Sequence, residues 1–179
     1  MILYNKSKIK AVIIMKNPTI KICPVKELIE MVQNESFQNT AAIISTSYSE
    51  PQELKALDSY IVLKYDDVDM PIINRSIKES DCQKAVDFIK ANRNKDTLYF
   101  CCDSAISRSS AMAASAYRFF DLDDMKIWEN PKYSPNALVF KMMCDAFNLP
   151  LDDCELDYRI SVNSKALKNA IHSKRNRDN

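Results

Sequence analysis

Cys102 and Arg108 are separated by five residues in the stretch LYFCCDSAISRSS, which covers residues 98–110. An apolar run precedes the cysteine, and a segment of small residues typical of a helix follows the arginine. A loop between a strand and a helix N-terminus can direct backbone N–H groups at an anion, and the helix dipole adds partial positive charge there. The same groups favour the thiolate of a cysteine at the base of the loop. The stretch therefore predicts a phosphate-binding loop with Cys102 as its nucleophile.

The neighbouring residues could supply the remaining contacts to a phosphoryl group. The planar guanidinium of Arg108 can hold two phosphoryl oxygens and follow them as the group changes from tetrahedral to planar. The loop residues would bind these oxygens through backbone N–H groups; they are Asp103, Ser104, Ala105, Ile106 and Ser107. The spacing alone is a short motif, so the alternative is a buried cysteine that ends a core strand and an arginine that starts a helix.

At these residues the chain resembles the cysteine-dependent protein tyrosine and dual-specificity phosphatases, whose signature is His-Cys, five residues, Arg, then Ser or Thr. The order of Asp67-Val68, the Cys102 loop and Ser134-Pro135-Asn136 is similar to a bacterial subgroup, over roughly residues 59–149. The resemblance implies hydrolysis of a phosphomonoester through a phosphocysteine intermediate, without a cofactor or metal. It implies a phosphorylated protein or peptide as the substrate, with phosphotyrosine favoured. It also implies that the Ser109 hydroxyl hydrogen-bonds the sulfur as the intermediate breaks down, although this hydroxyl could also cap a helix.

The family also uses a carboxylic acid on a facing loop to protonate the leaving oxygen. Asp66, Asp67 and Asp69 follow an apolar run that ends at Tyr65. We expect Asp67 to be the acid, because it precedes Val68 as the subgroup's acid precedes Ile or Val. Asp66 is the second candidate, and an acidic turn without chemistry is the alternative to both.

Two residues of the loop depart from the family signature. Cys101 stands where the family has histidine, and Ala105 stands where it has glycine; the chain contains no glycine at all. If position 105 needs a positive φ, alanine costs about 1–2 kcal/mol there. These departures leave open a weakly active or inactive relative that binds phosphorylated peptides. Redox sensing through Cys101 and Cys102 is a third hypothesis, which the strain of a disulfide between adjacent residues disfavours.

Short apolar runs bounded by turn residues predict buried strands at residues 11–15, 41–44, 60–65 and 97–102. Helical spacing predicts helices at 24–33, at 80–92 with a Ser80–Gln83 capping box, at 109–117 as the central buried helix, and at 135–147 with Ser134 as N-cap. Asn136 is favoured as part of that last helix start over a catalytic role. The alternation predicts an α/β fold with a mainly parallel sheet of four to five strands, helices on both faces, and ligands at the carboxyl ends of the strands.

Composition limits the remaining possibilities. A chain of 179 residues with 46% apolar content predicts one domain over residues 1–179, and a net charge of +1 gives no signal for nucleic acid or membrane binding. Six cysteines without a secretory signal indicate reduced thiols and a cytoplasmic protein, and a single histidine, His172, disfavours a zinc site. The loop carries Asp103 and no cation, which disfavours polyanionic lipid headgroups. Residues 164–179 are expected to form a solvated polar tail, with a docking patch for an acidic partner as the alternative.

Overall fold

The core of the molecule is a parallel sheet. The computed structural model describes residues 16–34 and 37–176, and in this part of the chain four strands pair in the order β1-β4-β2-β3. The strands are β1 (Thr19–Pro24), β2 (Thr40–Thr46), β3 (Tyr60–Lys64) and β4 (Thr97–Cys102). Three of the four predicted strands are confirmed, and the fourth, at residues 11–15, lies outside the described residues.

Strand β1 was missed in the sequence because its pattern is that of a half-exposed edge. Polar and apolar residues alternate in TIKICP, and the strand pairs on one side only, with β4. Pro24 ends the strand opposite Cys102, and α1 (Val25–Asn34) begins at the next residue. Pro24, which the sequence places at the start of the helix expected at 24–33, is instead the last residue of this edge strand, where proline is tolerated.

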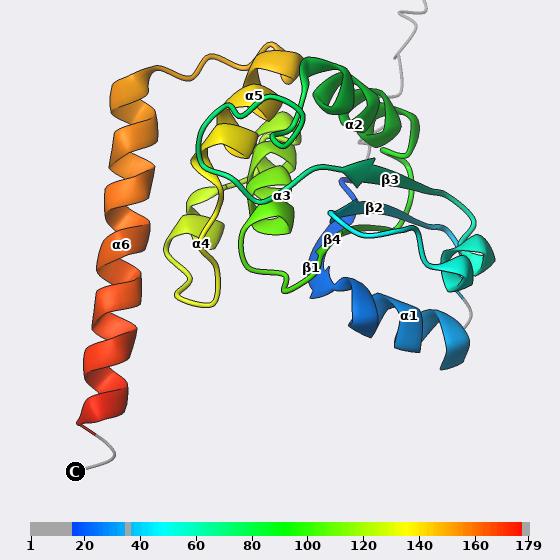
Figure 1. Ribbon diagram of the computed structural model, residues 1–179, viewed down its shortest axis with the longest axis horizontal. Helices are drawn as coiled ribbons and strands as arrows, with labels where there is room; N and C mark the ends of the chain where they lie inside the picture. Colours follow the sequence, from blue (N-terminus) through cyan, green and yellow to red (C-terminus); the bar gives the residue numbers. More distant parts are fainter. Residues whose placement is uncertain (1–15, 35–36, 177–179) are drawn as a thin grey trace, which may run out of the picture.

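Helices cover both faces of the sheet, as predicted (Figure 1). On one face, α1 and the short helix η1 (Gln52–Ala56) pack over strand residues that include Ala42, Ile44 and Cys101. On the other face, α2 (Glu79–Ala91), α3 (Arg108–Phe119) and α5 (Ala137–Phe147) pack over the alternate residues, such as Ile43 and Phe100. Successive side chains of a strand point to opposite faces, so Cys101 and Cys102 belong to different halves of the core.

The central position of α3 is confirmed, because every residue from Arg108 to Ala116 is buried. The predicted caps of two other helices are wrong. α2 begins at Glu79 because the Lys78 N–H donates to Asp81 Oδ2 at 3.2 Å, two residues ahead of the expected Ser80–Gln83 box. α5 begins at Ala137 because Asn136, and not Ser134, accepts the N–H of Val139 through its side chain at 3.0 Å.

The C-terminal residues form a long helix and not the expected polar tail. α6 (Asp153–Arg175) begins where the Asp152 side chain accepts the Glu155 N–H at 2.7 Å. Figure 1 shows α6 along one side of the molecule, with its C-terminal half reaching past α4 (Met125–Trp128). No helix within residues 16–34 and 37–176 is long and apolar enough to cross a membrane.

A buried ion pair attaches α6 to the rest of the fold. Arg159 Nε and Nη2 donate to the two carboxylate oxygens of Asp124 at 2.8 and 3.1 Å, and both side chains are less than one-tenth exposed. Asn163, one turn further, donates to the carbonyls of Trp128 and Tyr133 at 2.9 and 3.0 Å. These polar contacts fix the first half of α6 against the α4 region.

We expect Asp124→Ala to lower the free energy of unfolding by about 3 kcal/mol, because the buried Arg159 then keeps only the partly exposed Glu155, at 2.9 Å, as an acidic partner. The measurement is urea unfolding followed by circular dichroism. The matched control is Lys141→Ala, which breaks an exposed ion pair with Asp153 of 2.7 Å and should cost no more than about 1 kcal/mol. Equal losses in the two variants would show that the buried pair does not hold α6.

Candidate active site

The phosphate-binding loop predicted from the sequence lies at the centre of the carboxyl edge of the sheet. β4 ends at Cys102, residues 103–107 form the loop, and α3 begins at Arg108. Because β4 is flanked by β1 and β2, the loop opens between the ends of three parallel strands. Cys102 is 1% exposed, and its Sγ lies 3.1 Å from the Ser109 hydroxyl, within hydrogen-bonding distance.

Arg108 is fixed along one edge of its guanidinium. Nη1 donates to the Tyr65 carbonyl at 2.9 Å and to the Ser47 hydroxyl at 3.3 Å, and Nη2 forms an ion pair with the Asp103 carboxylate. The arginine is only 5% exposed, and its buried Nε has no hydrogen-bond partner within the described chain. A buried donor without an acceptor costs about 1–3 kcal/mol. An oxyanion that accepts a hydrogen bond from Nε would therefore remove the free-energy cost of this unpaired donor.

The Asp103 side chain has a place that the sequence did not indicate. Its Oδ1 accepts the Thr46 hydroxyl at 3.0 Å, and its Oδ2 pairs with Arg108. Through these contacts the first loop residue connects the end of β2 to the guanidinium.

Asp67 is held against the loop by two donors. Its Oδ1 accepts the Ser107 hydroxyl at 2.8 Å and the Asn136 side-chain amide at 2.9 Å. Asn136 is 4% exposed; besides capping α5, it donates to the Val68 carbonyl at 3.0 Å. Its predicted place in the helix start is confirmed, but its attachment of the 66–69 segment to the site was missed. Both hydrogen bonds of the Asp67 side chain within the described residues are made by Oδ1.

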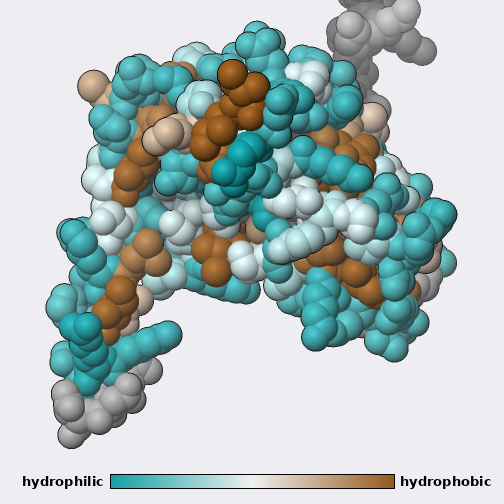
Figure 2. All heavy atoms as spheres, in the orientation of Figure 1, coloured by the Kyte–Doolittle hydropathy of each residue, from teal (hydrophilic) through white to brown (hydrophobic). Residues whose placement is uncertain are grey.

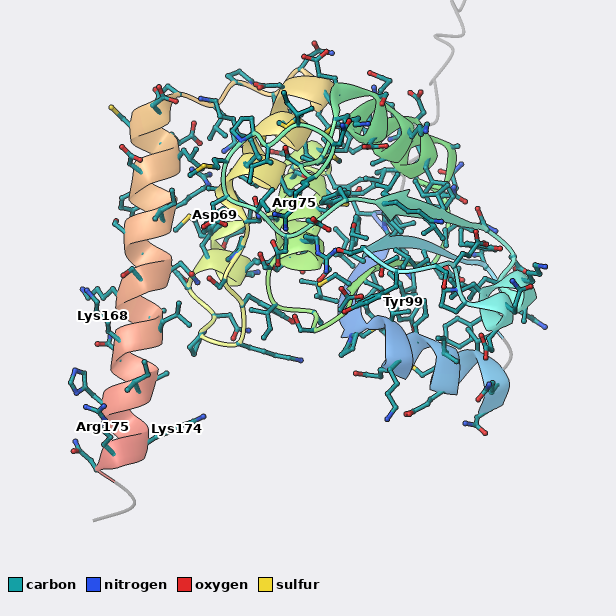
Figure 3. All side chains as sticks on the ribbon, in the orientation of Figure 1. Asp69, Arg75, Tyr99, Lys168, Lys174 and Arg175 are labelled. Atoms are coloured by element: carbon teal, nitrogen blue, oxygen red, sulfur yellow. The ribbon has the colours of Figure 1, made fainter. Side chains whose placement is uncertain are left out.

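The other two aspartates of this segment have different surroundings. Asp66 Oδ2 accepts Arg75 Nε at 2.6 Å, and the Asp66 N–H donates to the Arg75 carbonyl at 2.7 Å. The hydrogen bond from Arg75, with a second from Ser47, lowers the pKa of Asp66, so this group is a poor proton donor at neutral pH. Asp69 is exposed, and Figure 3 shows it on the same loop as Arg75. The geometry thus brings Asp67, and not Asp66, to the phosphate-binding loop.

Cys101 faces away from Cys102 and pairs with another cysteine. Its Sγ lies 3.4 Å from the Sγ of Cys23 on the adjacent strand, and both are free thiols. The hydrogen bond with Cys23, together with burial, raises the pKa of Cys101 well above the ordinary value. Burial also raises the pKa of Cys82 and Cys144 to about 12, so these thiols stay protonated at neutral pH. The opposite orientations of Cys101 and Cys102 give no support to a disulfide between them.

Ala105 adopts the conformation expected of a glycine. Its φ is 57°, and the other residues with positive φ in the described chain are asparagines and aspartates, which tolerate this region more readily. The residue is 1% exposed, so the strained position is packed on all sides. The sequence left open whether position 105 has a positive φ, and the structure shows that it does.

The cost of this backbone position can be measured with two glycine variants. Ala105→Gly and Ala113→Gly each delete one buried methyl group, but Ala113 lies within α3. We expect Ala105→Gly to change the free energy of unfolding by less than about 1 kcal/mol, because relief of the positive φ offsets the lost methyl group. Ala113→Gly should lower it by about 1–2 kcal/mol, since glycine is unfavourable in a helix. Equal losses in urea unfolding would contradict strain at Ala105.

A groove of about 510 Å³ lies directly beside the loop. Its apolar lining comes from Ile106 of the loop, Trp128 of α4 and Ile160 of α6, and Asp69 and Ser107 line its polar side. This groove could accept the residues next to a phosphorylated side chain. No cluster of three or more metal-binding side chains occurs in the part of the chain that the structure describes.

Comparisons with known proteins support the fold assignment. No protein-family model and no curated protein matches the sequence. The crystal structure of DUSP15 aligns with a TM-score of 0.50 and 18% identity, covering 82% of this chain and 92% of that chain. Human DUSP28 aligns with a TM-score of 0.40 and 15% identity, covering 86% of this chain and 96% of its own. The core catalytic domain of the PP-IP phosphatase SIW14 from S. cerevisiae aligns with a TM-score of 0.40 and 12% identity, covering 88% and 86%. The likeness to DUSP15 shows that the chain has a dual-specificity-phosphatase-like α/β fold with a parallel sheet.

Proposed function

We propose that this protein is a phosphomonoester hydrolase of the protein tyrosine and dual-specificity type. The observation that carries the proposal is the arrangement of Arg108 at the Cys102 loop. One edge of its guanidinium is fixed by Tyr65 and Asp103, and its buried Nε has no acceptor in the described chain. An oxyanion bound between this Nε and the loop N–H groups would lie at the end of β4, where the Cys102 sulfur is found.

In the proposed reaction the Cys102 thiolate attacks phosphorus, and an S–P bond forms as the ester P–O bond breaks. Arg108 and the N–H groups of residues 103–107 hold the non-bridging oxygens. Asp67 gives its proton to the leaving oxygen, and its carboxylate then accepts a proton from the attacking water. The S–P bond breaks, phosphate leaves, and the Ser109 hydroxyl stabilises the released thiolate by a hydrogen bond. The reaction requires no metal or cofactor.

We assign a phosphorylated protein or peptide as the substrate, with phosphotyrosine as the preferred residue, and the cytoplasm as the compartment. The loop carries Asp103 and no lysine or arginine among residues 103–107, which supports this choice over a polyphosphorylated headgroup. The groove lined by Ile106, Trp128 and Ile160 offers apolar contacts that a peptide can use.

A second candidate is a relative that binds phosphorylated peptides without turnover. Two observations favour it: Ala105 holds a φ of 57° without a glycine, and Cys101 turns its side chain to Cys23 and so supplies no polar group to the loop. A loop with low or no catalytic activity could still bind phosphate through Arg108 and its backbone N–H groups.

The deciding experiment is hydrolysis of a generic aryl phosphate by the purified protein in the presence of a chelator. We expect release of inorganic phosphate at a rate that the chelator does not change, with competitive inhibition by orthovanadate. Loss of activity on chelation would contradict the mechanism. Binding of a phosphotyrosine peptide with no phosphate release would support the second candidate instead.

A further inference from the structure

Helix α6 changes its charge along its length. Its first turns carry Asp153, Glu155 and Asp157, whereas residues 158–175 contain no acidic residue. The basic residues of that second part are Arg159, Lys165, Lys168, Lys174 and Arg175. Arg159 is neutralised by Asp124, and the last two residues suit the helix dipole at the C-terminus. Lys165 and Lys168 lie ahead of the last turn, so the dipole does not account for them.

An apolar stripe runs along the same part of α6. Ile160, Leu167 and Ile171 are spaced by seven and four residues, which places them on one face of the helix. Ile160 and Ile171 are 40% and 53% exposed. Figure 2 shows apolar residues along the α6 surface in the view that also presents the loop with Asp69. Lys168 and Lys174 lie on opposite sides of α6 in that view (Figure 3).

This stripe begins at the candidate active site. Ile160 lines the groove that Asp69 and Ser107 line from the other side. From there the surface formed by Ile160, Leu167, Lys168, Ile171 and Lys174, called the α6 strip below, leads away from the site. The fourteen residues between Ile160 and Lys174 span about 21 Å, which an extended peptide covers with about six residues.

We propose that the α6 strip binds an acidic segment of the phosphorylated protein substrate, within about ten residues of the phosphorylated side chain. This inference rests on the proposed function and adds the sequence context of its substrate. Aliphatic side chains of the segment pack on Ile160 and Ile171, and its carboxylates meet Lys168 and Lys174. A protein segment fits better than a membrane surface, because the strip carries no aromatic residue and continues into the groove beside the loop.

The test compares phosphotyrosine peptides that share one core and differ in an appended flank of Glu and Leu or of Lys and Leu, placed on either side. We expect kcat/KM to be about tenfold higher for an acidic flank, equivalent to about 1.4 kcal/mol, and the preference to fade at high salt. Lys168→Glu combined with Lys174→Glu should remove the preference and leave hydrolysis of a generic aryl phosphate unchanged. The matched control is Lys55→Glu with Lys84→Glu, which reverses two exposed charges on η1 and α2. This control should keep the preference.

Each other outcome has a defined meaning. Equal kcat/KM for the two peptides, with normal hydrolysis of the aryl phosphate, overturns the inference and leaves the proposed function standing. If the wild type hydrolyses neither peptide nor aryl phosphate, fluorescence anisotropy with the unphosphorylated acidic peptide tests whether the α6 strip binds it. Binding that the Lys168/Lys174 double variant loses supports the strip, and absence of binding overturns it. If kcat/KM is equal for the two peptides, two further measurements would show whether the strip binds something other than the substrate. Sedimentation with phosphatidylserine vesicles that the double variant abolishes would indicate a membrane, and self-association that it abolishes would indicate a second copy.

Discussion

Cys102→Ser is expected to lower kcat for aryl phosphate hydrolysis by about 10⁴-fold or more. The serine hydroxyl is smaller than the thiol but fits the same site, and it does not ionise at neutral pH. The loop amides and Arg108 should therefore still bind phosphate while the S–P bond can no longer form. The measurements are steady-state kinetics together with the affinity for a phosphotyrosine peptide, which should be retained.

The matched control is the same chemical change at the preceding residue. Cys101→Ser replaces a thiol that faces the opposite side of β4 and contacts Cys23. It should keep kcat within a few-fold of the wild type, because this side chain does not reach the loop. Aryl phosphate hydrolysis that survives Cys102→Ser would rule out the phosphocysteine mechanism.

Asp67→Asn is expected to lower kcat for phosphotyrosine by about 10²–10⁴-fold and to have a much smaller effect on an activated aryl phosphate. The asparagine oxygen can still accept from Ser107 and Asn136, so the geometry at Oδ1 is preserved while the proton is lost. A poor leaving group needs that proton, and a good one leaves without it. A general acid works only while it is protonated, so wild-type activity falls as pH rises through its pKa. That alkaline limb of the kcat profile should flatten in the variant.

Asp66→Asn provides the control for this assignment. Asp66 is paired with Arg75 at 2.6 Å, and its pKa is lowered by that hydrogen bond, so it holds no proton at neutral pH. Its replacement should change kcat for the two substrates by similar, small factors. If Asp66→Asn shows the leaving-group dependence and Asp67→Asn does not, the acid is one residue earlier in the chain.

Residues 97–119 could be predicted from the sequence because their arrangement is local. An apolar strand, a short loop and a helix of small residues fix where Cys102, Arg108 and Ser109 lie relative to one another. The buried strands β2 and β3 were equally readable, since continuous apolar runs are typical of a parallel sheet covered on both faces.

The contacts that complete the site depend on segments far apart in the chain. Tyr65 and Ser47 reach Arg108 because the parallel pairing of β2, β3 and β4 brings their carboxyl ends to one edge. Asn136 reaches Asp67 across 69 positions, and a helix-capping pattern carries no information about such a second partner.

Helix α6 shows the same division between local pattern and tertiary packing. Its second half is rich in lysine and resembles a solvated tail, and the residues that anchor its first half, Arg159 and Asn163, are themselves polar. Arg159 and Asn163 stabilise the fold only because Asp124 and the Trp128 carbonyl accept their hydrogen bonds in the tertiary structure. The sequence by itself determined the strand, loop and helix around Cys102 and the class of fold. The tertiary structure decided the orientation of Arg108, the contacts of Asp67 and the place of α6, because each depends on polar contacts whose partners lie far apart in the chain and meet only in the folded molecule.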